Sequence, residues 1–138
     1  MRGERTGWLK GDDGFPIETG LPFYMIGGSW RTFARLHMHD VGYPLTILSN
    51  YQMPPDAPTR LMPLVNDAEA LAQTKVVASA RIAALPGATA LLAGVVRLLE
   101  PNELVTSIYG LREGLLFDQL SEAERREGLA AKHDISVP

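Results

Sequence analysis

The fold is decided by residues 103–116, which read ELVTSIYGLREGLL. An apolar, strand-like run leads to Gly110, and a helix-like run then continues to Leu120. A glycine at a strand-to-helix turn permits a sharp reversal that a Cβ would hinder. Arg112 and Glu113 fall in the first helical turn, where backbone N–H groups point outward unpaired. Such a helix start is suited to holding an anion, and a guanidinium beside it adds a bidentate phosphate donor.

A second turn of the same kind lies earlier, where residues 23–30 read FYMIGGSW. We expect a short buried strand over Leu21–Ile26 and a helix from Trp30 that stops at Gly42. The apolar stripe of that helix recurs at helical spacing and comprises Trp30, Phe33, Ala34, His37, Met38 and Val41. The helical crossover makes the two strands parallel, so both glycine turns should lie at one edge of the sheet. Together these patterns predict an α/β domain with ligand chemistry at the strand ends.

Each turn has a functional and a structural interpretation. Gly27, Gly28 and Ser29 can contact phosphate, helped by Arg31, or they can serve strand–helix packing with Ser29 as the N-cap. In the second turn, Gly110, Arg112 and Glu113 can orient an anionic substrate. The alternative is an ion pair, or a glutamate placed favourably in the dipole of its own helix.

Two histidines and one further arginine are also candidate ligands. His37 and His39 suggest a metal site, but His37 lies on the apolar stripe and no carboxylate cluster accompanies it. A hydrogen-bonded core histidine is therefore the preferred interpretation, and no metal site is assigned. Arg81 can reach phosphate, or it can be a buried structural arginine.

Composition excludes several classes of protein. The 138 residues suit one domain or part of one, and a hydrophobic fraction of 46% is enough to form a core. A net charge of −3 argues against a nucleic-acid binder, and the absence of cysteine excludes thiolate metal sites. No secretory signal and no membrane-length apolar run are visible. We therefore expect a cytoplasmic protein with no nucleic-acid or membrane partner.

The remaining segments read mostly as short capped helices. Asp56, Asp67 and Ser79 are candidate N-caps, and Ser121 with Glu124 forms a candidate capping box for a last helix through Gly128. From Gly87 a strongly apolar helix is expected to be the most buried one, with a face made of Ala88, Leu91, Leu92, Val95 and Leu99. The organisation expected is a lead-in loop over 1–20, the main body over 21–128 and a flexible tail over 129–138.

Four blocks of sequence, in this order and spacing, resemble the exopolyphosphatase / guanosine pentaphosphate phosphatase family. They are residues 23–38 (FYMIGGSWRTFARLHM), 43–45 (YPL), 85–88 (LPGA) and 107–116 (SIYGLREGLL). The resemblance spans roughly residues 8 to 125. It implies the actin-like ATPase fold with ribonuclease-H-like lobes, of which this chain would be the later part of the second lobe.

The resemblance also shows what this chain lacks. The family's phosphate loops, Asp-x-Gly-Ser/Thr-Asn-Ser/Thr and Asp-x-Gly-Gly-Gly-Ser-x-Glu, have no match here, nor has its water-positioning glutamate. Position 49 is serine where relatives often carry histidine. We therefore assign no catalytic residue, no metal ligand and no cofactor to this chain, and we expect a fragment, a truncated reading frame or an excised domain.

The function implied is part of an enzyme that releases terminal phosphate from polyphosphate or guanosine pentaphosphate with a divalent metal such as Mg²⁺. The isolated chain is expected to be inactive, to bind these phosphates weakly through Gly27, Gly28, Ser29, Arg31, Gly110, Arg112 and Glu113, and to form a homo-oligomer. Two alternatives stay open. One is a non-catalytic nucleotide- or phosphate-binding module, and the other is a structural remnant that only folds or dimerises.

Overall fold

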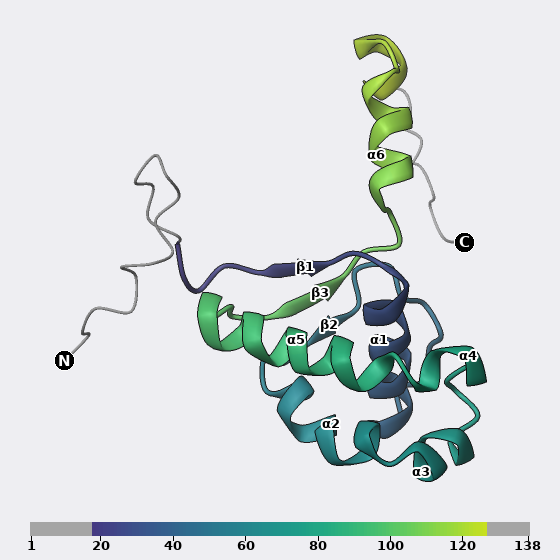
Figure 1. Cartoon of the computed structure of the whole chain (residues 1–138). Helices are drawn as coiled ribbons and strands as arrows, with labels where there is room; N and C mark the ends of the chain where they lie inside the picture. The colour runs from purple at the N-terminus through teal and green to yellow at the C-terminus, as the bar shows by residue number, and fades with distance from the viewer. Residues whose placement is uncertain (1–17, 127–138) are drawn as a thin grey trace, which may run out of the picture. The chain divides into compact units, whose positions relative to one another are not determined.

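The computed structural model describes residues 18–126, and the chain divides into two compact units between Ile108 and Tyr109 (Figure 1). The first unit is built on a small sheet of order β1-β3-β2, made of β1 (Phe23–Met25), β2 (Gln52–Met53) and β3 (Leu104–Thr106). β1 pairs with β3 in parallel and β2 pairs with β3 antiparallel. The α/β class and the parallel pair expected from the sequence are confirmed, although both strands are shorter than expected.

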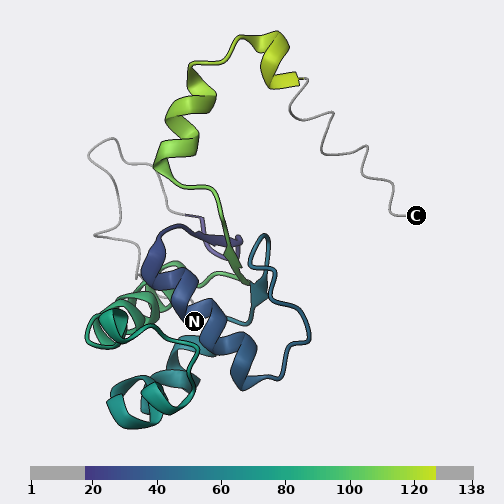
Figure 2. The same cartoon turned by 90° about the vertical axis from the view of Figure 1, so that its right-hand side faces the viewer.

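Helices lie to one side of this sheet and enclose the core (Figures 1 and 2). They are α1 (Gly28–Asp40), α2 (Ala57–Asn66), α3 (Ala68–Gln73), α4 (Ser79–Ile82) and α5 (Leu85–Leu99). α1 packs against α5 and β3, and α2 packs against α5 and α3. Phe33, Leu36, Leu92 and Leu104 are completely buried between these elements.

α1 follows the apolar stripe read from the sequence along most of its length. Phe33, Ala34, His37 and Met38 are buried, but Val41 is 47% exposed, contrary to expectation. The reason is the way the helix ends. Gly42 adopts a left-handed conformation with φ +63°, and the Tyr43 N–H donates to the Met38 carbonyl at 2.8 Å. This is a Schellman motif, which leads the chain away from the helix before Val41 can reach the core.

The prediction for α5 is wrong in two respects. Its buried residues are Leu85, Thr89 and Leu92, whereas Leu91 is 61% exposed. It is also not the most buried helix, since α1 contributes Thr32, Phe33, Ala34, Leu36, His37 and Met38 to the interior. α5 is apolar on all sides, so its periodicity could not identify the face that contacts α1 and α2.

The candidate N-caps differ in outcome because of backbone conformation. Asp67 is extended, and its carboxylate accepts from the backbone N–H groups of Glu69 (3.1 Å) and Ala70 (2.9 Å), as predicted. Asp56 precedes α2 but has helical φ and ψ, and its side chain makes no capping bond. Ser79 is the first residue of α4 and therefore not its cap. Capping requires an extended residue whose side chain can turn back to the helix start.

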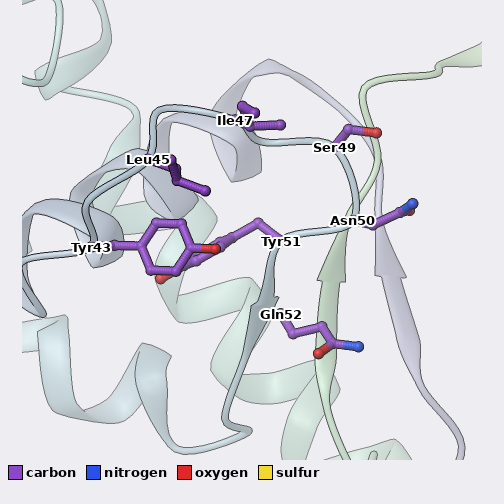
Figure 3. Close-up of a pocket in the computed structure, with 7 residues that line it drawn as sticks. All are labelled: Tyr43, Leu45, Ile47, Ser49, Asn50, Tyr51 and Gln52. Atoms are coloured by element: carbon purple, nitrogen blue, oxygen red, sulfur yellow. The ribbon is translucent and has the colours of Figure 1, made fainter. Parts of the chain in front are cut away.

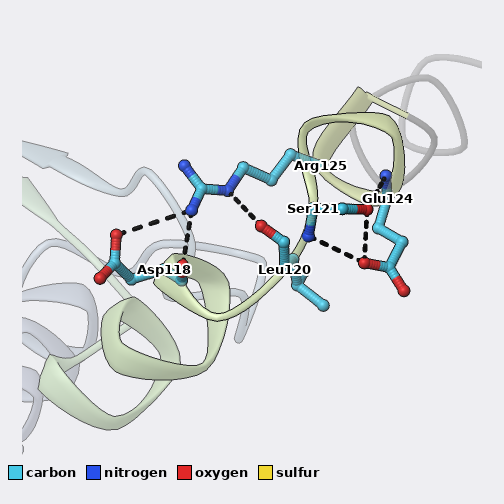
Figure 4. Close-up of polar contacts among 5 residues, drawn as sticks. All are labelled: Asp118, Leu120, Ser121, Glu124 and Arg125. Carbon is cyan, nitrogen blue, oxygen red and sulfur yellow. Dashed lines mark hydrogen bonds and ion pairs between the residues drawn. The ribbon is translucent and has the colours of Figure 1, made fainter.

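The second unit contains α6 (Leu111–Asp118) and a further helical segment over residues 122–126. The predicted capping box is present, since the Ser121 N–H donates to Glu124 Oε2 at 2.8 Å and the Glu124 N–H donates to Ser121 Oγ at 3.4 Å (Figure 4). Arg125 joins the two helices by donating to the carbonyls of Asp118 and Leu120.

Three sequence predictions fall partly or wholly beyond the described residues. These are the lead-in over 1–20, the tail over 129–138 and the end of the last helix at Gly128. None of the helices between residues 18 and 126 combines the length and the apolar character that a bilayer span requires.

Candidate functional site

The turn between β1 and α1 is built on a backbone that only glycine adopts readily. Gly27 has φ +122° and ψ +161°, a region forbidden to residues with a Cβ. The turn lies at the carboxyl edge of the sheet, where the Ser107 N–H beyond β3 donates to the Met25 carbonyl of β1 at 3.0 Å. This is the edge at which ligands bind in open α/β sheets.

Gly28, the next residue of the turn, lies close to the side chain of Arg81. A Cβ placed on Gly28 would lie 2.7 Å from one terminal nitrogen of the Arg81 guanidinium and 2.9 Å from the other. The guanidinium therefore lies directly against the first residue of α1. Arg81 itself is exposed, so the interpretation as a buried structural arginine is wrong. No carboxylate within residues 18–126 forms an ion pair with it.

The first turn of α1 leaves donors available. Ser29 is not the N-cap, because the helix begins one residue earlier at Gly28 and the capping position is Gly27, which has no side chain. Within the described residues, the backbone N–H groups of Gly28, Ser29 and Trp30 have no acceptor. Arg31 bends back over the turn, and its Nε donates to the Gly27 carbonyl at 3.3 Å. The start of α1 thus combines free N–H groups with the guanidinium groups of Arg31 and Arg81.

The start of α6 has a different arrangement. Gly110 is extended, with φ −126°, and its N–H donates to Glu113 Oε2 at 2.7 Å. The Glu113 side chain therefore caps its own helix, which is the structural alternative considered for this residue. Arg112 and Leu111 beside it are exposed. Gly110, Arg112 and Glu113 belong to the second unit, whereas Gly27, Gly28, Ser29 and Arg31 belong to the first.

His37 is a hydrogen-bonded core histidine, as the sequence indicated. It is 4% exposed, with Nδ1 at 2.8 Å from the Tyr51 hydroxyl and Nε2 at 3.0 Å from an Arg60 terminal nitrogen. Because arginine can only donate, Nε2 must accept, and the neutral ring carries its proton on Nδ1. Burial and the charge of Arg60 lower the pKa of His37, while Asp40, which pairs with Arg60 at 3.5 Å, opposes the shift. Burial likewise raises the pKa of Tyr51.

A cavity of about 300 Å³ lies beside this network, over the loop that leads into β2 (Figure 3). Its lining residues are Tyr43, Leu45, Ile47, Ser49, Asn50, Tyr51 and Gln52. The Tyr43 and Tyr51 rings meet edge to face, with centroids 4.9 Å apart. Ser49, which replaces the histidine frequent in the resembled family, lies on its wall. The residues of this lining supply hydroxyl and amide groups, and no carboxylate or imidazole is among them.

The described residues offer no group of three or more His, Asp or Glu side chains that could hold a metal ion. Sequence reasoning did not place Arg81 at the α1 turn, because the contact joins residues 53 positions apart. The Gly-Gly pair was the only available signal, since a second glycine beside a turn glycine indicates that something approaches the backbone closely.

Comparison with solved structures finds the same fold in the Aquifex aeolicus member of the Ppx/GppA protein family. The two chains are 18% identical with a TM-score of 0.60, and the match covers 76% of this chain and 37% of that one. No protein-family model and no curated protein matches the sequence. At this identity the likeness shows the fold alone, and it confirms the fold class expected from the sequence. The match also spans little more than a third of the neighbour's length, which agrees with part of a larger fold.

Proposed function

We propose that this chain forms part of the second lobe of a phosphohydrolase of the exopolyphosphatase / guanosine pentaphosphate phosphatase type. Its own contribution is to hold a phosphate group of the substrate at the start of α1. The observation that carries this proposal is the position of the Arg81 guanidinium against Gly28, beside unpaired backbone N–H groups.

Electrostatics support an anion at this turn. The N-terminus of a helix carries a partial positive charge, and a guanidinium held against it is unfavourable unless an anion lies between them. Phosphate oxygens can accept from the N–H groups of α1 and from Arg81 together, and Arg31 adds a second cation at the same turn. Gly110, Arg112 and Glu113 stay in the proposal as contacts of the second unit, although Glu113 already accepts from Gly110.

The isolated chain should bind weakly and should not turn over substrate. One exposed turn without the opposing lobe supports roughly millimolar affinity, or ~4 kcal/mol. The side chains of residues 18–126 do not fit the Mg²⁺ site expected of the complete enzyme, because no ligand cluster is formed among them. The metal ligands and the water-positioning glutamate would therefore come from outside residues 18–126.

The test is an NMR titration with short-chain polyphosphate. We expect the amide signals of Gly28, Ser29 and Trp30 to shift, and Arg81→Gln to weaken that response. Arg97→Gln is the matched control, since Arg97 is also exposed but lies on α5 away from the turn. If both variants weaken the amide shifts equally, the effect comes from the net charge of the protein, and Arg81 is not part of the site.

A phosphate-release assay tests the catalytic part of the proposal. We expect no magnesium-dependent hydrolysis of polyphosphate or guanosine pentaphosphate above background. Turnover by the purified chain would show that the assignment to an incomplete enzyme is wrong, whatever the NMR titration gives.

A homo-oligomer is favoured by the exposed edge of the sheet. Among the strands within residues 18–126, β1 lies at an edge of the sheet, and Tyr24 and Ile26 are 59% and 53% exposed. An unpaired strand edge with apolar side chains is a template for pairing with a second chain. Light scattering should show a mass above that of one chain, and a monomer at high concentration would contradict this part of the proposal.

A further inference from the structure

A second, larger cavity lies at the other end of α1 from the glycine turn. We name it the Tyr43 groove; its volume is about 650 Å³, and its lining residues are Arg35, Met38, His39, Gly42, Tyr43, Leu45, Thr46 and Val76. This volume falls within the ~300–1,000 Å³ typical of small-molecule sites. All of its walls come from the first unit.

The groove follows from the way α1 ends. The left-handed Gly42 reverses the chain, and the Tyr43 N–H donates to the Met38 carbonyl at 2.8 Å. Met38 is only 5% exposed, so the accessible apolar floor of the groove is formed by Tyr43 and Leu45, which are 42% and 52% exposed. The Tyr43 ring is fixed further by its edge-to-face contact with Tyr51, at 4.9 Å between centroids. The apolar floor is thus held by backbone geometry and by a buried ring.

The charged residues of the groove have one sign. Arg35 and His39 are exposed and stand one helical turn apart on the same face of α1. No carboxylate is among the lining residues. The neighbouring carboxylate on α1, Asp40, forms an ion pair with Arg60 at 3.5 Å. The apolar floor is therefore bordered by the Arg35 guanidinium, whose charge no lining residue balances, and by the His39 ring.

We propose that the Tyr43 groove binds a small anion that carries an aromatic ring. The ring would lie on the partly exposed side chains of Tyr43 and Leu45, where an aromatic ring makes favourable contacts. The anionic group would accept from Arg35, with His39 as a second donor. This site is distinct from the start of α1, because it requires a ring as well as a negative charge and lies at the opposite helix end.

A matched pair of fluorescent probes tests both requirements. Anilinonaphthalene sulfonate carries a ring system and a sulfonate, whereas N-phenylnaphthylamine has a similar ring system without the charge. We expect the sulfonate to bind more tightly and to shift the NMR signals of Thr46 and Val76. Inorganic phosphate, which lacks the ring, should leave those signals unchanged.

Variants then locate the site. Arg35→Gln should weaken sulfonate binding about threefold to fivefold, the size expected for an exposed ion pair, and leave the neutral probe unaffected. Thr46→Trp should block both probes by filling the groove, and Arg97→Gln on α5 is the charge-matched control. Equal effects of Arg35→Gln and Arg97→Gln, or a sulfonate that shifts signals only outside the groove, would overturn the proposal.

Discussion

The two strand–glycine–helix turns look alike in sequence but differ in their electrostatics. At the start of α1 the first N–H groups have no acceptor among residues 18–126, and the guanidinium groups of Arg31 and Arg81 lie beside them. At the start of α6 the carboxylate of Glu113 accepts from the Gly110 N–H and caps the helix itself. The difference shows that a glycine before a helix does not by itself make an anion site. The side chains around the turn determine whether a guanidinium or a carboxylate lies at the helix start.

The helices that follow the two turns also differ in how many of their side chains are buried. α1 contributes buried side chains to the core of the first unit, including the fully buried Phe33. α6 has no buried residue, and its apolar side chains Leu111, Leu115, Leu116 and Phe117 are 44–78% exposed. A buried helix fixes the position of the turn that precedes it. The geometry of the α1 turn is thus supported by packing, whereas that of the α6 turn depends on its own capping bond.

The largest expected difference concerns stability. Phe33→Ala removes a fully buried ring from α1 and should lower the free energy of unfolding by about 3–5 kcal/mol. Leu116→Ala removes a side chain that is 65% exposed on α6, and its effect should stay within about 0.5 kcal/mol. Denaturant titrations of both variants measure this. A comparable cost for the two would mean that α6 is packed in solution.

The next difference distinguishes the two turn glycines. Gly27→Ala should cost about 1–3 kcal/mol, because φ +122° is strained for any residue with a Cβ. Gly110→Ala should be nearly neutral, since φ −126° is open to all residues. Denaturant midpoints test the first variant, and hydrogen exchange of the α6 amides tests the second. A neutral Gly27→Ala would show that the β1–α1 turn adopts another conformation.

A third difference is the pH dependence confined to the first unit. The folded-state pKa of His37 is lowered from 6.5 by burial and by Arg60, so the unfolded chain takes up this proton more readily. The stabilisation from neutral His37 is therefore complete above pH 6.5 and is lost as the pH falls from there toward the lowered pKa. Protonation of His37 would also place the Nε2 N–H, a donor, next to the Arg60 guanidinium, which can only donate.

The measurement is the urea midpoint of wild type and His37→Gln on either side of this window. We expect the wild-type midpoint to fall on acidification and the variant to lose most of that dependence. If the urea midpoints of both proteins changed equally with pH, groups other than His37 would cause the pH dependence.

The smallest expected effect is on anion affinity. Arg81→Gln should weaken polyphosphate binding about threefold to tenfold, because it removes one charge-assisted bond at a solvated turn. Arg112→Ala should weaken it less and leave the fold intact, since Arg112 is exposed and the helix start beside it is capped by Glu113. The NMR titration described above compares the two. If Arg112→Ala lowered the affinity for polyphosphate more than Arg81→Gln, the main phosphate contact would lie in the second unit.

Local signals in the sequence were sufficient for several elements. The stripe of α1, the Asp67 cap and the Ser121–Glu124 capping box each depend on residues within one or two helical turns, and each is present. His37 was correctly placed in the core because it lies on that stripe. The parallel pairing of β1 and β3 followed from chain connectivity, which does not require knowledge of the packing.

Signals were insufficient where the answer depends on distant parts of the chain. One local interpretation also failed, since Ser29, considered as the cap of α1, lies inside the helix, which begins at Gly28. Leu91 was expected on the buried face of α5, yet Leu85, Thr89 and Leu92 face the core. An all-apolar helix presents several equivalent faces, and only contact with α1 and α2 selects among them.

The sequence by itself determined the α/β class, the two glycine turns, the parallel strand pair and the likeness to the exopolyphosphatase / guanosine pentaphosphate phosphatase family. These features are encoded in periodicity, capping residues and motif order, which act over short distances along the chain. Only the tertiary structure placed Arg81 against Gly28, joined His37 to Tyr51 and Arg60, and opened the Tyr43 groove at the end of α1. Those contacts join residues far apart in the chain, and their positions are set by how the helices pack on one small sheet.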